Sequence, residues 1–592
     1  MIVYGDHKRM EDARHLRTRV SDVAESLGDL ASGITRHAEL VGLFIAVSEL
    51  VQAMADREFQ STGLDADSPP RQQGARLLLG LASEVVSSWQ SGFATSGPLD
   101  LGLRRMLAEL DCQGAVSTGA AEGYAHYALY PESYLVAARD SGLGPNTCVI
   151  GIRSIGLGLA AIVAAAIGTP APLSVRPVGH PFQRQIRADP DVIAPWRHDP
   201  SASFAIVDEG PGLSGSSVNA VVRWLREIGI AIEQIHLFPS HSGEPGREAS
   251  REIRRTWSYC RKHVAASFER TFAIGPHMPA LRDWVAEAVG NSEVIVTDIS
   301  GGTWRDLHYA NEAEWPASWR AREAQKFLAV AGEARWLVKF AGLGATGQRK
   351  SSTAVMLHKA GFGPEVVGLC HGFLIERWID GTTLDGAPIS NRDLVVELGR
   401  YLAWRAIHLH TSEEGASLSA LADMATHNAA EALGSVRAAE LREWFSQQTP
   451  PKHARRVEID GRLHPWEFIV CADRKLVKTD AVDHCVAHDL IGCQPVEWDV
   501  AAARFEHALS ASESDTLAGY IEEQLRKAFQ RSIDVELIDY LQPCYLAFQL
   551  GFWSLAAQSE HGGEKARTQK AVKRYQEGLV RFLDDLRRRS RA

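Results

Sequence analysis

The feature that most constrains the fold is an apolar strand that ends in two adjacent carboxylates and continues into a turn of glycines and serines. It reads FAIVDEGPGLSGSS over residues 204–217, and a helical pattern follows it. Strand-like and helical runs alternate around it, in the order 148–152, 157–167, 173–177, 204–207, 218–228 and 231–238. Strands that alternate with helices predict a parallel sheet with right-handed crossovers, and ligands of such sheets bind beyond the carboxyl ends of the strands.

The side chains at the end of this strand fit a sugar phosphate. Carboxylates accept hydrogen bonds strongly, so Asp208 and Glu209 can hold the two hydroxyls of a ribose. A phosphate needs converging donors, which a helix N-terminus offers, and glycines let the backbone approach it closely. The residues assigned to the phosphate are Gly212, Ser214, Gly215, Ser216 and Ser217. An ordinary strand–turn–helix unit with a serine cap is the alternative.

The segment resembles the signature of type I phosphoribosyltransferases, in which an apolar strand leads to two acidic residues and a phosphate loop. The resemblance covers about residues 120–245 and implies a domain that binds phosphoribosyl diphosphate (PRPP). It implies displacement of diphosphate at the anomeric carbon, with Asp208, Glu209 and Arg184 as catalytic residues. It also implies Mg2+ near Asp208 and Glu209, bound mostly through oxygens of the ligand and water.

Two further segments match positions of the same family. The loop after the first strand, which binds diphosphate in the family, corresponds here to Arg153, Ser154 and Gly156. The mobile segment after the second strand corresponds to a stretch with three basic groups, Arg176, His180 and Arg184. A solvated loop is the alternative for that stretch. The run EGYAHYALYPE offers residues that could shape an acceptor pocket, namely Glu122, Tyr127, Tyr130 and Glu132.

A second pattern begins at Lys339, in the β-rich run WLVKFAG. It continues with FLIERWIDG over 373–381, YLAWRAIHLH over 401–410, DGRLHPWE over 460–467, Thr479-Asp480 and WDVA over 498–501. These runs resemble aminoglycoside phosphotransferases and choline kinases over about residues 290–510. The resemblance implies a bilobal α+β domain in which Lys339 contacts the phosphates of ATP and Glu376 begins the hinge.

The same resemblance shows departures at the catalytic loop. Arg462 stands where the family has its catalytic aspartate, and Glu467 stands where it has a metal-binding asparagine. Asp480 matches the later metal-binding aspartate, and no helix glutamate is evident over 348–357. Two interpretations stay open. An active enzyme could use Asp460 as base with Glu467 and Asp480 on Mg2+, or the architecture could persist with altered or lost phosphotransfer.

A dense polar cluster follows the second metal-type aspartate. It consists of Asp480, Asp483, His484, His488 and Asp489. His484 and His488 are four residues apart, a spacing that would share one helix face and could bind a transition metal. A polar network that supports the loop is the favoured alternative.

Length and composition indicate several domains in one α/β protein. The chain has 592 residues, of which 45% are hydrophobic and 23% charged, and one core rarely serves such a length. We expect a helical N-terminal region over 1–118, a phosphoribosyltransferase-like domain over 119–246 and a helical connector over 247–289. The kinase-like domain, with its helical C-terminal part, would take 290–592.

The net charge and the cysteine content limit the binding partners and the cellular location expected for the protein. A formal net charge of -10 argues against a duplex nucleic-acid partner, which requires a concentrated basic face. The eight cysteines include no C-x-x-C pair, so we expect reduced thiols in a cytoplasmic protein. The first residues lack the apolar core of a signal peptide, and no membrane association is expected. Homodimer formation stays an alternative to a monomer.

The favoured function at this point is transfer of a phosphoribosyl group from PRPP to an unidentified small acceptor. The kinase-like domain implies ATP as a further ligand. One rival is a non-enzymatic protein that senses PRPP or a nucleotide. Another is a small-molecule kinase with a vestigial phosphoribosyltransferase domain.

Overall fold

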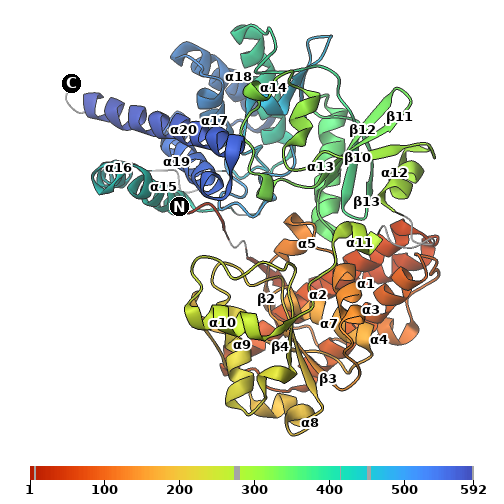
Figure 1. The fold of residues 1–592 in the computed structure, drawn as a ribbon. Helices are drawn as coiled ribbons and strands as arrows, with labels where there is room; N and C mark the ends of the chain where they lie inside the picture. Colours follow the sequence, from red (N-terminus) through yellow and green to blue (C-terminus); the bar gives the residue numbers. More distant parts are fainter. Residues whose placement is uncertain (6–7, 273–279, 414, 450–454, 590–592) are drawn as a thin grey trace.

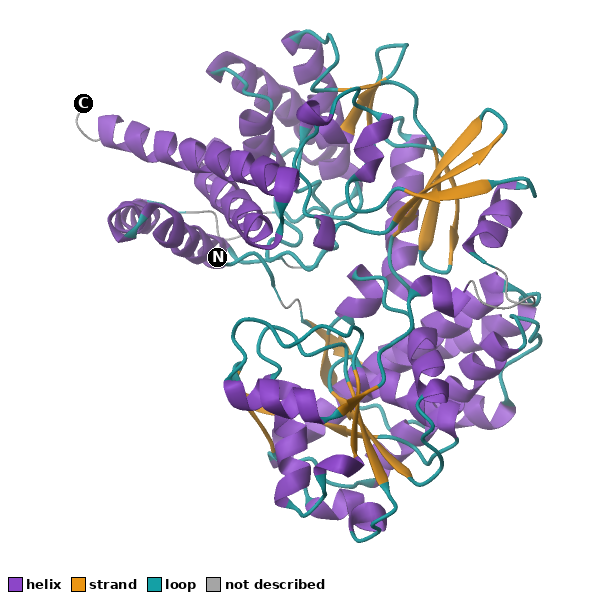
Figure 2. Cartoon of the chain, in the orientation of Figure 1, coloured by secondary structure: helices purple, strands orange, loops and turns teal. Residues whose placement is uncertain are grey.

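The computed structural model describes residues 1–5, 8–272, 280–413, 415–449 and 455–589. The chain forms two halves, a lower one of N-terminal helices around a parallel sheet and an upper one of an antiparallel sheet joined to helices (Figures 1 and 2). The first residues run in the upper half, where the N-terminus lies beside α15 (Leu418–Leu433). The predicted α/β class with a helical C-terminal part is confirmed, and the four boundaries stay a prediction.

The N-terminal part of the chain is mostly helical and contains a short strand pair. Its helices are α1 (Ala13–Ser26), α2 (Ile34–Thr62), α3 (Pro69–Gln90), α4 (Leu101–Ala108), α5 (Glu122–His126) and α6 (Pro131–Asp140). Strands β1 (Arg9–Asp12) and β2 (Ala115–Thr118) pair antiparallel around α1 to α4. Helix α2 has the length and composition of a membrane span, but 67% of its most apolar window is buried inside the protein. A core helix has the same composition, so this is weak evidence for a membrane span.

The predicted parallel sheet is confirmed. Its strands are β3 (Thr147–Ile152), β4 (Leu173–Val175), β7 (Ser203–Val207), β8 (Ile235–Phe238) and β9 (Arg261–Lys262), in the order β4-β3-β7-β8-β9. Helices α7 (Gly156–Ile167), α8 (Ala194–Arg197), α9 (Ser216–Glu227) and α10 (Arg251–Tyr259) connect or cover them. The order reverses between β3 and β7, so their carboxyl ends form the crevice where such sheets bind ligands.

Burial on both faces explains the unbroken apolar run of β7. Phe204 and Ile206 pack into the core beneath α9, whereas Ala205 and Val207 face the core shared with α2, α3 and α7. Strands covered on both sides need apolar residues at every position.

Two details differ from the prediction. Residues 232–234 form a 3-10 turn before β8 rather than part of the strand, and residues 177–186 form a hairpin of β5 (Pro177–His180) and β6 (Gln183–Ile186).

The upper half opens with an antiparallel sheet of five strands. They are β10 (Ile295–Asp298), β11 (Lys326–Ala331), β12 (Ala334–Phe340), β13 (Val366–Cys370) and β14 (Phe373–Arg377), in the order β10-β11-β12-β14-β13. Helix α13 (Gly344–Lys359) follows β12 and packs beside β13. The long segment 299–325 between β10 and β11 contains short 3-10 turns and reaches the C-terminal helices.

The rest of the upper half is helical around a small sheet. Its helices are α14 (Asn391–His408), α15, α16 (Ser435–Gln447), α17 (Glu497–Glu506), α18 (Ala511–Phe529), α19 (Val535–Ser559) and α20 (Gly562–Arg589). Strands β15 (Thr382–Thr383), β16 (Phe468–Val470) and β17 (Leu476–Lys478) form the sheet. The predicted connector contains α10, α11 (Phe268–Phe272) and α12 (Leu281–Val289) as well as β9, and its residues 273–279 lie outside the described residues.

A buried polar clamp joins the two halves. One carboxylate oxygen of Glu132, on α6, lies 2.8 Å from His37 Nε2 on α2 and 2.9 Å from His371 Nε2 in the turn between β13 and β14. All three side chains are at most 1% exposed. Glu132 is therefore part of the core and not of an acceptor pocket. The N-terminal helices, the parallel sheet and the antiparallel sheet share this core.

We predict that Glu132→Ala destabilises the protein by about 3 kcal/mol, because two buried imidazoles lose their acceptor. The measurement is the midpoint of urea unfolding followed by circular dichroism. Glu227→Ala, which removes a 66% exposed carboxylate from α9, is the control and should change stability by less than about 0.5 kcal/mol. Equal effects of the two substitutions would contradict a structural clamp.

Candidate functional site

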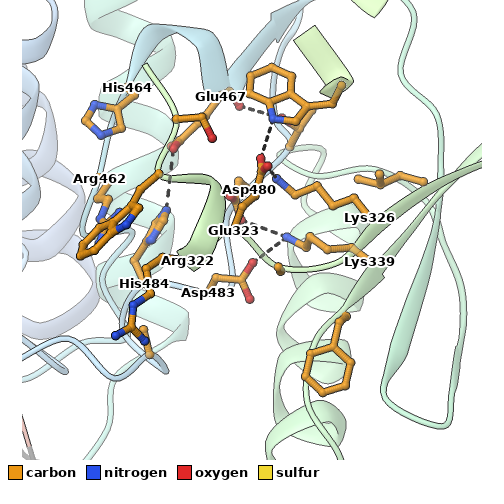
Figure 3. Close-up of a pocket in the computed structure, with 18 of the residues that line it drawn as sticks. Arg322, Glu323, Lys326, Lys339, Arg462, His464, Glu467, Asp480, Asp483 and His484 are labelled. Carbon is orange, nitrogen blue, oxygen red and sulfur yellow. Dashed lines mark hydrogen bonds and ion pairs between the residues drawn. The ribbon is translucent and has the colours of Figure 1, made fainter. Parts of the chain in front are cut away.

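A cavity of about 280 Å3 lies between the antiparallel sheet, the segment 299–325 and the C-terminal helices. Its sheet side is lined by Leu337 and Lys339, and its far side by Arg462 and His484 (Figure 3). The lower half and the N-terminus also contribute to the wall, through Ala125, His126, Tyr127 and Tyr4. The cavity thus collects residues from parts of the chain that the sequence places more than 400 positions apart.

Lys339 occupies the charged centre of the cavity. Its Nζ lies 2.9 Å from Asp480 Oδ1 and 2.7 Å from Asp483 Oδ2. Burial alone would lower the pKa of Lys339, but the two carboxylates outweigh burial and raise the pKa well above its ordinary value. Lys350, on α13, donates to the other oxygen of Asp483 at 2.8 Å. The sequence shows no glutamate on this helix. The helix supplies Lys350 instead, and Asp483 lies between Lys350 and Lys339.

The segment 299–325 closes the cavity and is tied to both sides of it. Near its end, Glu323 accepts hydrogen bonds from Lys326 Nζ at 2.9 Å and from the indole N–H of Trp304 at 2.5 Å. On the other side, Arg305 forms a buried ion pair with Glu564 of α20 at 2.7 Å. Arg320 binds Glu560 at 2.7 Å. The segment is therefore a fixed bridge from the sheet to the helices.

The loop that contains Asp460 and Gly461 is fixed in place by Asp499. The carboxylate of Asp499 accepts the backbone N–H groups of Asp460 and Gly461, each at 2.9 Å. Asp460 is 1% exposed, accepts the hydroxyl of Tyr401 at 2.6 Å and lies 3.4 Å from Lys478 Nζ. It is not among the residues that line the cavity. Asp460 thus faces the interior, where a substrate hydroxyl has no access to it.

Arg462 and Glu467 do line the cavity. Arg462 donates to Asp489 at 2.7 Å, and its guanidinium lies 4.0 Å from the ring centre of Phe552. Glu467 accepts from Lys478 at 2.8 Å. Burial raises the pKa of Glu467 and Lys478 opposes the rise. The position that would carry a base in the family therefore carries a paired cation.

The hinge region provides an apolar slot. Trp378 and Ile379 line the cavity together with Leu337 of β12 and Ile469 of β16. The ring of His308, from the segment 299–325, stacks on Trp378 at 5.2 Å. Glu376 is buried beneath, and burial raises its pKa to about 7 while Lys339 opposes the rise. The residues that line this end of the cavity are therefore mostly apolar or aromatic.

Carboxylate oxygens in the cavity are of the type that Mg2+ prefers. Asp480 and Asp483 both present oxygens around Lys339. Burial would raise the pKa of Asp480, but Lys339 and Lys326 lower it well below its ordinary value, so this group is ionised at neutral pH. The donor set therefore fits Mg2+. Oxygen and nitrogen atoms of Asp460, Glu467 and His484 also lie within 4.8 Å of one another, and both of these carboxylates pair with Lys478.

The predicted acidic pair lies at the carboxyl end of β7 and is half-buried. Asp208 Oδ1 accepts the backbone N–H of Glu209 at 2.9 Å, and Tyr134 donates to the Asp208 carbonyl at 2.8 Å. Burial raises the pKa of each carboxyl to about 7, and the repulsion of Asp208 and Glu122 adds to the rise for Glu209. No described carboxylate–cation pair involves Asp208 or Glu209.

The predicted phosphate turn is closed against the β5–β6 hairpin. Ser214 and Ser216 are buried, and both hydroxyls donate to the Pro181 carbonyl, at 3.3 Å and 2.5 Å. Gly212 and Gly215 have positive φ values of 58° and 64°, which glycine adopts without strain. Ser217 lies in the first turn of α9. A phosphate could reach these hydroxyls only after Pro181 moves.

The predicted diphosphate arginines are engaged elsewhere. Arg153 is buried, with Nε 3.0 Å from Asp56 and Nη2 2.5 Å from Asp65. Arg176 pairs with Asp56 and donates its backbone N–H to Asp65 at 2.7 Å. The structure does not bring these guanidiniums to an open face beside Asp208, because acidic side chains from the N-terminal helical region neutralise them. That region held no motif by which the pairing could be foreseen.

The remaining predicted residues fall into two groups. His180 and Ser154 are exposed, and Arg184 donates to the Gly179 carbonyl at 2.8 Å. Gly156 is buried where α7 approaches β7, and a Cβ there would lie 2.5 Å from the Val207 carbonyl oxygen. Gly156 therefore permits close packing of helix on strand.

A second cavity, of about 680 Å3, lies among α2, α3 and β4, away from the acidic pair.

Sequence reasoning missed the residues that only the tertiary fold brings together. Arg322, Lys326 and Lys350 line the cavity but carry no local motif. Asp483 and His488 were named only as members of a cluster.

No family model and no curated protein matches the chain. Solved structures with a similar fold include choline kinase LicA from Streptococcus pneumoniae, at 16% identity over 42% of this chain and 89% of that one, with a TM-score of 0.28. A choline/ethanolamine kinase family protein from Mesorhizobium loti has 16% identity over 44% and 88%, with a TM-score of 0.29. Spectinomycin phosphotransferase has 12% identity over 49% and 92%, with a TM-score of 0.30.

These three neighbours are small-molecule kinases and phosphotransferases by name. TM-scores this low carry no argument about the activity of this chain. The three matches cover between 42% and 49% of this chain. The prediction of a phosphoribosyltransferase gains no support from them.

We predict that stability falls as pH rises from 5 to 7.5, in part through the acidic pair. The folded pKa of Asp208 is about 7, above the value of an unfolded aspartate, so the folded state holds more protons across this range. The contribution of Asp208 to the free energy of unfolding is therefore fully present below pH 4 and is lost as the pH rises through 7. Asp208→Asn should flatten the dependence, measured as the urea midpoint at each pH.

Asp199→Asn is the matched control. Hydrogen bonds from Ser201 and Asn146 lower the pKa of Asp199, so this group titrates below the tested range. The control should change the midpoint equally at every pH. An unchanged slope in Asp208→Asn would show that the pair titrates normally.

Proposed function

We propose that the chain is a small-molecule phosphotransferase that uses ATP and Mg2+ in the cavity between the antiparallel sheet and the helical part. The observation that carries the proposal is the bridging position of Lys339 between Asp480 and Asp483. The slot beside Trp378 would hold the base of the nucleotide, and Lys339 would hold its phosphates.

Phosphoryl transfer needs positioning and charge stabilisation more than covalent help from the protein. Mg2+, held by Asp480 with Asp483 or Glu467, would neutralise charge on the phosphates. Lys339 and Lys326 would stabilise the charge that spreads over the transferred group. Arg462, which is paired with Asp489, would keep the acceptor side of the cavity free of an unpaired negative charge. Asp460 takes no part in the proposed chemistry because its oxygens bind Tyr401 and Lys478.

We predict that Lys339→Ala lowers acceptor-dependent ATP consumption by about 100-fold or more, the usual effect of removing one preorganised charge contact. Asp480→Asn should act similarly by weakening the Mg2+ site. The measurement is ADP release with a panel of small acceptors. Lys475→Ala, which removes a 71% exposed lysine near Asp473, is the control and should retain full activity.

The rival sensor function gives a different pattern in the same assay. Saturable ATP binding that depends on Lys339, with no ADP release for any acceptor, would support a sensor. ATP binding that is indifferent to Lys339→Ala would contradict both functions at this cavity.

Phosphoribosyl transfer at the acidic pair is the second candidate. The specific observation in its favour is that Asp208 and Glu209 lie at the carboxyl end of β7, next to the reversal of strand order. In this proposal the carboxylates hold the ribose of PRPP with Mg2+, and the hairpin tip at Pro181 moves to admit the phosphate to Ser214 and Ser216.

We predict that diphosphate release from PRPP, measured with a panel of nitrogenous acceptors, is lost in Asp208→Asn and retained in Lys339→Ala. ATP consumption should show the opposite pattern, because the two sites use different residues. Loss of both reactions in either variant would contradict two independent sites. Absence of diphosphate release from the wild type with every acceptor would remove this second candidate.

A further inference from the structure

Two arginines of the cavity differ from the lysines and the third arginine that line it. Lys326, Lys339, Lys350 and Arg462 each lie within 3 Å of a carboxylate oxygen. Arg322 forms no ion pair with any carboxylate in the described part of the chain. Arg377 also lacks one there, but it belongs to the hinge and lies over Trp336. Arg322 is therefore the cation available at the end of the cavity opposite the hinge.

Aromatic rings hold Arg322 in place. Its guanidinium carbon lies 4.8 Å from the ring centre of Tyr4, 5.0 Å from that of Tyr127 and 5.7 Å from that of Trp319. Ring faces attract a cation without neutralising its charge. A guanidinium so fixed keeps its fork of N–H donors oriented, and this geometry matches two oxygens of a phosphate. In Figure 3, Arg322 lies on the side of Arg462 and His484, across from Lys326 and Lys339.

The walls at this end are flat and apolar. Trp319, Trp466, Phe552 and Trp553 line the cavity, and Trp466 stacks on His464 at 4.4 Å. Aromatic side chains offer large planar contact surfaces. A ligand here would meet planar walls and one oriented guanidinium that forms no ion pair among the described residues.

A single turn of helix separates this end from the acidic pair. Ala125, His126 and Tyr127 of the α5 region line the cavity, whereas a Cβ on Gly123, in the same turn, would lie 3.1 Å from the carboxyl carbon of Glu209. His488 fastens the turn, with its ring nitrogens 2.6 Å from the Tyr127 hydroxyl and 3.0 Å from Glu122. The backbone N–H of Leu343 also binds the Tyr124 carbonyl at 3.0 Å.

We propose that Arg322 is the phosphate receptor for the acceptor of the phosphotransfer reaction, and that this acceptor is a phosphate monoester with a planar ring, of the nucleoside monophosphate type. The inference rests on the proposed phosphotransferase function and names its substrate class. In the reaction, an acceptor oxygen bonds to the γ-phosphorus of ATP, the bond from that phosphorus to the bridging oxygen breaks, and ADP leaves with the electron pair. The proton of an acceptor hydroxyl passes to water.

The neighbouring acidic pair gives this substrate class a source. Transfer of a phosphoribosyl group to a ring nitrogen, the second candidate reaction, yields a phosphate monoester joined to a planar ring. The two sites on either side of α5 would then act on successive forms of one compound. The reaction that supplies the acceptor is thus of the phosphoribosyl-transfer class, carried out by this chain or by another enzyme.

The test compares ribonucleoside monophosphates with the matching nucleosides. The full-length protein is saturated with a non-hydrolysable ATP analogue and Mg2+, which occupies the Lys339 end, and each compound is titrated by calorimetry. We expect the wild type to bind at least one monophosphate about ten-fold or more tighter than its nucleoside, as a charge-assisted contact provides. Arg322→Ala should reduce that ratio to about two-fold or less, and Arg322→Lys should give an intermediate ratio.

Arg400→Ala is the matched control, because Arg400 is an exposed arginine on α14 that pairs with Glu397. It should retain the wild-type ratio, and circular dichroism should be unchanged in every variant. Equal affinity of the wild type for nucleosides and monophosphates, or a ratio that survives in Arg322→Ala, overturns the inference. Failure of the ATP analogue to bind to the wild type overturns the phosphotransferase proposal instead. The monophosphate ratio is readable in either case.

Discussion

The contact of Lys339 with Asp480 and Asp483 organises the upper half of the molecule. It joins β12 to the loop after β17, and Lys350 extends it to α13. A buried charge is tolerated when it is paired with an opposite charge, and removal of one partner leaves the other uncompensated, which is strongly destabilising. The loop so fixed also carries His488, which binds Tyr127 and Glu122. The loop after β17 therefore contacts both the antiparallel sheet and the α5 region of the lower half.

The segment 299–325 sets which motions remain possible. Its buried ion pair between Arg305 and Glu564 would cost roughly 3–5 kcal/mol to break by removing one partner. Opening of the cavity should therefore keep this pair and move the segment together with α20. The hydrogen bonds around Glu323 are nearer the cavity and include one donor from the sheet, Lys326, and one from the segment itself, Trp304. The segment is therefore anchored more firmly to the helices than to the cavity wall.

The sequence predicted those features that local patterns encode. The apolar run of β7, buried on both faces, and the alternation with α7 and α9 gave the parallel sheet and the position of Asp208 and Glu209. The same reasoning failed for Arg153, because its partners Asp56 and Asp65 come from a helical region without a motif. Arg322 escaped notice for a related reason: Tyr4 and Tyr127, which hold it, are close to it only in the folded chain.

The arginine at position 462 can be interpreted in two ways, and the electrostatics of the site distinguishes between them. As a replacement for a catalytic aspartate it indicates altered or lost phosphotransfer. For an anionic acceptor, however, a carboxylate at this position would be repulsive, by about 4 kcal/mol per unit charge at 4 Å in a partly solvated site. Arg462 pairs with Asp489, so the pair is neutral and that repulsion is absent, while Arg322 supplies the attraction. For the proposed acceptor class, the arginine at position 462 thus removes a repulsion that an aspartate there would cause.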